Sequence, residues 1–129
     1  MKPPDNAKII EGELATFWFD ESGILCAIAK NVPRSLEKQR DNYVFIKQIT
    51  GNKKVCLLSD TTSSTPQDKE TRDYSATEMP NVFKAMAIIS DSVLGQFSAN
   101  VFLALKDQPI PIKFFADENT AIEWLKAYL

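Results

Sequence analysis

Residues 54–59 read Lys-Val-Cys-Leu-Leu-Ser, and residues 85–90 read Ala-Met-Ala-Ile-Ile-Ser. Both are short, nearly continuous apolar runs, which is the pattern of strands that are covered on both faces of a sheet. Strands of this kind occur in parallel sheets that pack between helices. The two stretches therefore predict an α/β domain with parallel strands at its centre.

The chain before these strands predicts a hairpin and then a helix. Residues 8–20 are rich in β-branched and aromatic side chains and are followed by Glu-Ser-Gly, so we expect one strand there and a second strand over 24–30. Ser35 can cap a helix that ends just before Gly51. This helix would connect the hairpin to the first buried strand.

A long polar segment separates the two buried strands. Residues 60–73 contain no apolar side chain, and we expect them to form a loop that is more mobile than its flanks. A brief helix is expected around 76–84, where Pro80 weakens it or delays its start.

The C-terminal third predicts helix, strand and helix. Asp91 or Ser92 can cap a helix whose apolar residues recur on one face. Pro109 ends that helix, residues 110–115 form the last strand, and Asp117 caps a final helix. The expected inward side chains are Val93, Leu94, Phe97, Val101, Ala104 and Leu105 in the first helix, and Ala121, Ile122, Leu125, Tyr128 and Leu129 in the second. Trp124, on the apolar side or margin of the second helix, is also expected to pack in the core, as is Phe97.

This order of elements predicts one mixed sheet, in which an N-terminal antiparallel hairpin is followed by parallel strand–helix units with right-handed crossovers. The chain has 129 residues, of which 44% are hydrophobic, and this is enough for one sizeable core. We expect residues 1–7 to be a flexible N-terminus and residues 8–129 to form a single α/β domain.

Charge and hydropathy limit the classes of partner and the cellular location that we expect for the protein. The 15 basic and 17 acidic residues are spread along the chain and give a net charge of −2, without the basic block that a nucleic acid would require. No segment approaches the roughly 20 apolar residues of a membrane span, and the first residues lack the apolar stretch of a signal peptide. We therefore expect a cytoplasmic protein with no nucleic-acid partner and no membrane span.

The chain contains no histidine, which excludes triads with a histidine base, histidine-ligated zinc and histidine phosphotransfer. Cys26 and Cys56 each lie in an apolar stretch without a second ligand at metal-binding spacing, so they are interpreted as buried thiols. We expect no catalytic residues, no metal and no cofactor, and hence no enzyme.

A binding site is expected beyond the carboxyl ends of the parallel strands, where ligands collect in open α/β sheets. The residues that follow these ends are Asn31 and Arg34, residues 60–64, residues 90–92 and Asp117. Helix capping is the simpler interpretation of Asp91 and Asp117, and a functional role for them remains the alternative. Asp60 precedes a segment without a helix pattern, so both a functional and a structural role remain open for it.

The order of elements and the ending Ile-Lys-Phe-Phe-Ala-Asp-Glu-Asn-Thr-Ala-Ile-Glu-Trp-Leu over residues 112–125 resemble the STAS and SpoIIAA-like domains, the anti-sigma-factor antagonists and their relatives. The resemblance implies a SpoIIAA-like fold. It also implies a regulatory serine in an Asp-Ser-Ser/Thr-Gly motif at the start of a helix, for which Asp73-Tyr74-Ser75-Ala76 is the nearest counterpart. This counterpart lacks the glycine and the first serine, and Ser63 is a second candidate phosphoacceptor.

The resemblance favours a non-enzymatic regulatory or protein-interaction module, whose binding rim we predict to include Asp60, Arg72, Ser75 and Asp91. Arg72 could pair with Asp60 or Asp91, receive an anionic group of a partner, or simply close the loop over the sheet. The alternative is a carrier domain for a small molecule or lipid. Another protein, a small apolar ligand and a second copy of the chain in a homodimer all remain open as partners.

Overall fold

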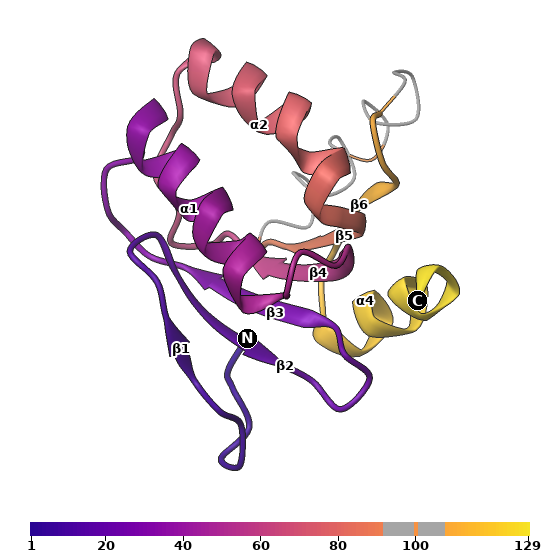
Figure 1. Cartoon of the computed structure of the whole chain (residues 1–129). Helices are drawn as coiled ribbons and strands as arrows, with labels where there is room; N and C mark the ends of the chain where they lie inside the picture. Colours follow the sequence, from indigo (N-terminus) through magenta and orange to yellow (C-terminus); the bar gives the residue numbers. More distant parts are fainter. Residues whose placement is uncertain (92–99, 101–107) are drawn as a thin grey trace.

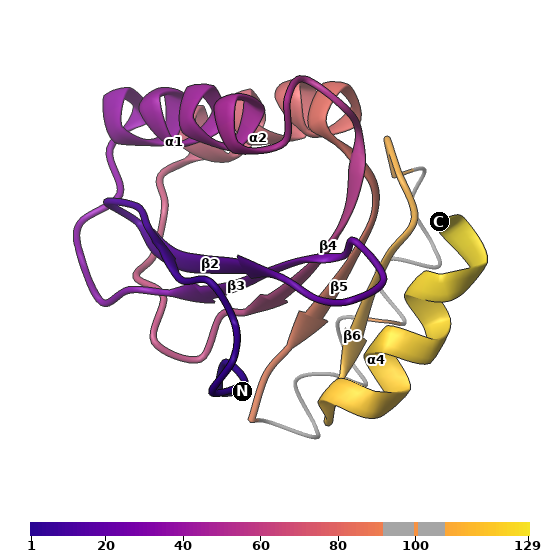
Figure 2. The same ribbon diagram turned by 60° about the horizontal axis from the view of Figure 1, so that its bottom comes forward.

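The computed structural model describes residues 1–91, 100 and 108–129, and these residues form three layers (Figures 1 and 2). A sheet lies in the middle. Helices α1 (Leu36–Ile49) and α2 (Lys69–Val82) lie side by side over one face. Helix α4 (Glu118–Leu125), continued by the 3-10 turn η1 (Lys126–Tyr128), covers the other face.

Six strands are present in the described part of the chain, and they lie in the sheet in the same order as in the sequence. The strands are β1 (Ile10–Glu11), β2 (Ala15–Phe19), β3 (Leu25–Ala29), β4 (Val55–Asp60), β5 (Phe83–Ile89) and β6 (Ile112–Phe115). Strands β1 to β3 are antiparallel, and β3 to β6 are mutually parallel. The predicted mixed sheet is thereby confirmed.

Each face of the sheet has its own core because neighbouring side chains of a strand point to opposite faces. On β4, Leu57 packs with Tyr43 and Ile46 of α1, whereas Leu58 packs with Leu125 of α4. We call these the helix-pair core and the α4 core. The continuous apolar sequence at 54–59 is explained by this double coverage.

Both cysteines are free and buried in the α4 core, as predicted. Burial raises the pKa of Cys26 to about 12, and it also raises the pKa of Cys56. These thiols are therefore protonated at neutral pH and serve as small apolar side chains.

Helix α1 begins and ends where the sequence predicts. The Ser35 hydroxyl accepts a hydrogen bond from the backbone N–H of Lys38 at 3.2 Å. At the other end, Gly51 has a φ of 64°, a left-handed conformation that glycine adopts without strain.

The strand predicted over 8–20 is divided into β1 and β2, which is a correction of the sequence-based expectation. A tight turn separates them, closed by a hydrogen bond of 2.9 Å from the N–H of Gly12 to the carbonyl of Ala15. Without a side chain, Gly12 lets the turn pack closely on the ring of Phe17.

We expect Gly12→Ala to destabilise the domain by about 1–2 kcal/mol, because an added Cβ would lie 2.9 Å from Phe17 Cε2 and 3.0 Å from the Ala15 carbonyl oxygen. Urea denaturation measures this change. Glu13→Ala, at the next and exposed position, is the control and should shift stability by less than about 0.5 kcal/mol. Equal effects of the two substitutions would mean that the turn has room for a side chain.

The segment after β4 also departs from the prediction. Helix α2 starts at Lys69, earlier than expected, because the Asp68 carboxylate caps it and accepts from the N–H of Thr71 at 2.8 Å. Pro80 lies in its last turn, and β5 follows directly from Phe83. The loop expected over 60–73 is therefore confined to residues 61–68.

Helix α4 is capped by Asp117, as predicted, through a 2.9 Å hydrogen bond from the N–H of Thr120. Ala121 and Leu125 are fully buried, but Leu129 is 52% exposed, so its predicted inward position is wrong. The chain passes into η1 after Leu125, and this shifts the later side chains off the helical face.

Trp124 is half-buried at the margin of the α4 core, between the rings of Phe115 and Tyr128, rather than inside it. The helix expected after Asp91, including Phe97 and its other apolar residues, lies outside the described residues apart from position 100.

The side chain of Asn100 covers the outer edge of β6. Its amide accepts a 2.9 Å hydrogen bond from the N–H of Phe114 and donates a 3.0 Å bond to the carbonyl of the same residue. Asn100 thus pairs with Phe114 as a neighbouring strand would.

The N-terminal segment contacts the domain. Met1 and Ala7 pack against the α4 core, and the flexibility expected for residues 1–7 stays a prediction. None of the helices in the described ranges is long and apolar enough to cross a membrane.

Candidate functional site

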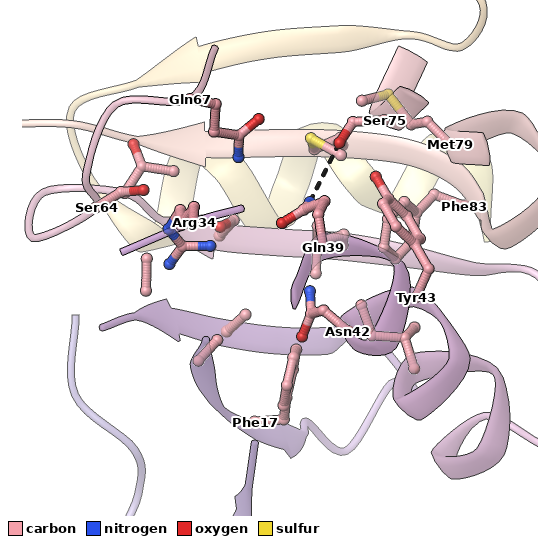
Figure 3. A pocket seen from close by; sticks show the side chains of 18 residues that line it. Phe17, Arg34, Gln39, Asn42, Tyr43, Ser64, Gln67, Ser75, Met79 and Phe83 are labelled. Atoms are coloured by element: carbon pink, nitrogen blue, oxygen red, sulfur yellow. Dashed lines mark hydrogen bonds between the residues drawn. The ribbon is translucent and has the colours of Figure 1, made fainter. Parts of the chain in front are cut away.

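A pocket of about 230 Å³ lies between the helix pair and the sheet (Figure 3). Its floor is the face of the sheet opposite α4. Side chains of β2 to β5 form this floor: Ala15, Phe17, Ala27, Ala29, Leu57, Ser59, Phe83 and Met86. Most of these side chains are apolar. Along each strand they alternate with the side chains of the α4 core, which point to the other face of the sheet.

The small side chains of β3 leave room for the pocket. Ala27 and Ala29 are both buried, and their methyl side chains do not extend far above the sheet. Helices α1 and α2 therefore span a space that their own side chains must fill. They fill it only in part, and with several polar groups.

The helical side of the pocket carries a buried hydrogen bond between the two helices. The Gln39 Nε2 amide donates to the Ser75 hydroxyl at 3.2 Å, and both residues are more than nine-tenths buried (Figure 3). Tyr43 lines the pocket beside them. Burial raises its pKa to about 12, although the polar side chains of Ser75 and Gln39 partly offset this effect. Tyr43 is accordingly a neutral phenol at physiological pH.

Within the part of the chain that the structure describes, three buried polar atoms of pocket residues have no hydrogen-bond partner: Arg34 Nε, Gln39 Oε1 and Asn42 Oδ1. A buried donor or acceptor that is left unpaired costs about 1–3 kcal/mol relative to its solvated state. An apolar floor below one donor and two acceptors of this kind is the usual construction of a small-molecule site.

The loop over 61–68 forms part of the pocket wall through Thr61, Ser64 and Gln67. The Thr65 hydroxyl donates to the carbonyl of Val32 at 2.6 Å, which ties this loop to the segment that carries Arg34. The pocket thus extends to the carboxyl ends of β3 and β4, where a ligand site was expected.

A family described as "Domain of unknown function (DUF7793)" matches residues 17–129, which is most of the chain and includes most of the pocket. The chain belongs to the DUF7793 family. A comparison of this DUF7793 chain with curated proteins finds no significant match.

The DUF7793 chain is similar to a solved structure described as an uncharacterized protein from the DUF3478 family with a SpoIIAA-like fold, from Shewanella loihica PV-4. The TM-score is 0.56 at 19% sequence identity, and the match covers 92% of this chain and 91% of that one. This likeness concerns the fold, and it confirms the SpoIIAA-like fold that the sequence predicts.

Of the predicted rim residues of this DUF7793 domain, Asp60 lies on the opposite face of the sheet from the pocket. It alternates with Ser59, which lines the pocket, and its carboxylate is 3.1 Å from the Met1 ammonium group. Burial acts to raise the pKa of Asp60, but hydrogen bonds from Thr62 and the N-terminus outweigh it and lower the pKa. Asp60 is thus an ionised group with structural partners.

Arg72 does not form either ion pair considered from the sequence. Its exposed guanidinium donates to the backbone carbonyl of Gln67 at 2.8 Å, and none of the ion pairs among the described residues joins it to Asp60 or Asp91. This hydrogen bond joins the first turn of α2 to the loop over 61–68.

Ser75 does not begin a helix, and this corrects the premise for phosphate binding there. It lies in the middle of α2, 8% exposed, where the backbone N–H groups are used by the helix itself. Ser63 and Asp91 are exposed. The structure therefore does not gather Asp60, Arg72, Ser75 and Asp91 into one rim.

The sequence missed two helical pocket residues, Gln39 and Asn42. The signal was a polar residue on the inward side of an amphipathic helix, since Gln39 is one turn before Tyr43 on the buried face. Arg34 and Ser64 had been placed at the strand ends, and both line the pocket. Within the described ranges, no three His, Cys, Asp or Glu side chains are grouped so as to hold a metal ion.

Proposed function

We propose that this domain is a non-catalytic binding module that takes up one small, mainly apolar molecule between the helix pair and the sheet. The observation that carries the proposal is the combination of a 230 Å³ pocket with three unpartnered polar atoms in its wall. A packed core leaves few voids larger than a water molecule and few unpaired polar atoms. A ligand would fill the space and pair the atoms.

The volume sets the size of the ligand. An apolar cavity of about 150 Å³ accepts benzene, and drug-sized ligands occupy roughly 300–1,000 Å³. A pocket of about 230 Å³ lies between these values. It suits a molecule of one ring, or a short chain, with one or two polar groups.

A regulatory or protein-binding role is a second candidate, and the loop over 61–68 favours it. Thr61, Ser64 and Gln67 line the pocket, while Ser63 of the same loop is exposed. A ligand in the pocket would contact one side of a loop whose other side faces solvent. We propose that such a loop could report occupancy to a protein partner.

Screening a library of small one-ring and short-chain compounds by thermal shift and two-dimensional NMR tests the pocket. We expect binders that raise Tm and perturb the amides around Ala27, Gln39 and Ser75. Ala29→Met, which projects a longer side chain into the pocket, should weaken these binders by about tenfold or more.

The matched control is Ala127→Met on the exposed side of the C-terminal turn, which should leave the affinities unchanged. Binding that Ala29→Met does not weaken would place the site elsewhere. A library without any binder would remove the proposed function.

A further inference from the structure

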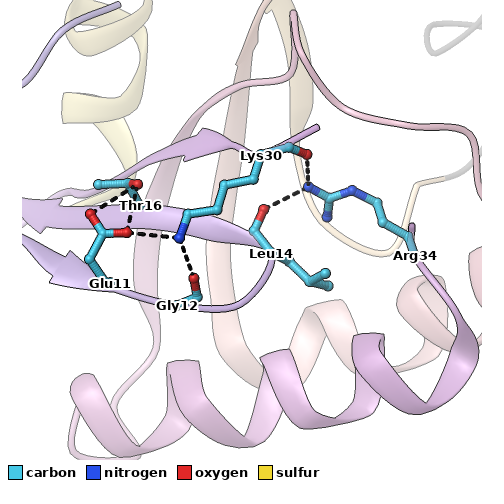
Figure 4. A network of polar contacts seen from close by, with 6 residues as sticks. All are labelled: Glu11, Gly12, Leu14, Thr16, Lys30 and Arg34. Atoms are coloured by element: carbon cyan, nitrogen blue, oxygen red, sulfur yellow. Dashed lines mark hydrogen bonds and ion pairs between the residues drawn. The ribbon is translucent and has the colours of Figure 1, made fainter. Parts of the chain in front are cut away.

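The proposed function does not specify the chemical class of the ligand. The position and charge of Arg34 indicate that class. Arg34 lies between β3 and α1, half-buried, and lines the pocket (Figures 3 and 4). Its Nη2 donates to the backbone carbonyl of Leu14 at 2.7 Å and to that of Lys30 at 3.3 Å. These two carbonyls fix the guanidinium in place but do not neutralise its charge.

The nearby acidic side chains already have other partners. Glu11 Oε2 lies 2.8 Å from Lys30 Nζ (Figure 4). Glu13 Oε1 lies 3.3 Å from Lys38 Nζ. No ion pair within the described ranges includes Arg34. Burial lowers its pKa. Among the residues that the structure describes, the charge of Arg34 is therefore uncompensated at the pocket wall.

The partnerless Nε of Arg34 adds a geometric argument to the charge. It is buried and is the one donor among the three unpaired pocket atoms. A guanidinium forms its strongest hydrogen bonds with a planar anion such as a carboxylate. The other two unpaired atoms, Gln39 Oε1 and Asn42 Oδ1, are acceptors and would repel a second negative charge.

We infer that the pocket binds a monocarboxylate, with the carboxylate against Arg34 and the apolar body over the floor formed by Phe17, Leu57 and Met86. A hydroxyl or N–H of the ligand would pair with Gln39 Oε1 or Asn42 Oδ1. This inference rests on the proposed function, since it assigns the ligand class of the same pocket. A phosphate suits the site less, because its two charges would meet one arginine and two amide oxygens.

Matched acids and amides test the inference directly. The probes are 3-phenylpropionate against 3-phenylpropionamide, and hexanoate against hexanamide, titrated into the wild-type chain at pH 7 by calorimetry and NMR. We expect each acid to bind at least about tenfold more tightly than its amide. Acids that bind no better than amides would overturn the inference while leaving the proposed function intact.

Variants assign the preference to Arg34. Arg34→Gln should remove the preference for the acids and leave the amides nearly unchanged, so that amide binding also reports an intact pocket. Arg72→Gln, at an exposed arginine outside the pocket, is the control and should retain the preference. An Arg34→Gln chain that still prefers the acids overturns the inference. If neither acids nor amides of either shape bind the wild type, both the ligand class and the proposed pocket function fail.

Discussion

Ser75→Asp is expected to lower the free energy of unfolding by about 2–5 kcal/mol, because a carboxylate would be placed in a buried position between two helices. Ser75 is 8% exposed, and its hydroxyl accepts a hydrogen bond of 3.2 Å from the Gln39 amide. One amide donor does not replace the water that a carboxylate loses on burial. The sequence-based expectation was the opposite, since it placed Ser75 at an exposed helix start.

Denaturation in guanidinium chloride at pH 7 measures this loss. Ser63→Asp introduces the same charge at an exposed serine, and we expect a change below about 0.5 kcal/mol. Burial raises the pKa of a carboxyl group, so the Ser75→Asp deficit should shrink as the pH falls and the new group becomes protonated. If both variants were equally stable, the interior of the helix pair would have to be open to water.

Leu125→Ala is expected to cost about 2–5 kcal/mol, because it removes a side chain that is 0% exposed at the centre of the α4 core. Leu125 packs with Leu58 of β4, and its backbone carbonyl is 3.8 Å from the thiol of Cys56. The truncation would leave a cavity between α4 and the sheet.

Leu129→Ala makes the identical change four residues later, at a side chain that is 52% exposed. We expect it to shift stability by less than about 0.5–1 kcal/mol. Thermal and urea unfolding of the two variants together decide whether both leucines face inward. Comparable losses would restore the sequence-based prediction that both leucines face inward.

The sequence predicted the sheet well because a strand that is covered on both faces has a nearly continuous apolar sequence. The apolar runs at 54–59 and 85–90 became β4 and β5, displaced by at most two residues at either end. The caps Ser35 and Asp117 were also predicted correctly, since a side-chain oxygen that precedes a helix acts locally.

The pocket and the first half of helix α2 were missed for one shared reason. The buried residues of α2 are Thr71, Ser75 and Val82, of which two are polar. A helix that faces a cavity with hydroxyl groups has little hydrophobic periodicity, and this periodicity is the main signal for a helix. The polarity that suits the pocket therefore made residues 60–73 resemble a loop. Only Asp68, three residues before the buried Thr71, marked the helix start.

The bond between Asn100 and the edge strand β6 affects how these molecules behave in a crowded solution. An exposed strand edge is a template on which a second chain can add its own strand, and repeated addition leads to fibres. Here the amide of Asn100 occupies the outward N–H and C=O of Phe114. Another chain would have to displace Asn100 before pairing there, and the opposite edge, β1, offers only two residues. Both ends of the described sheet are thus poor starting points for aggregation.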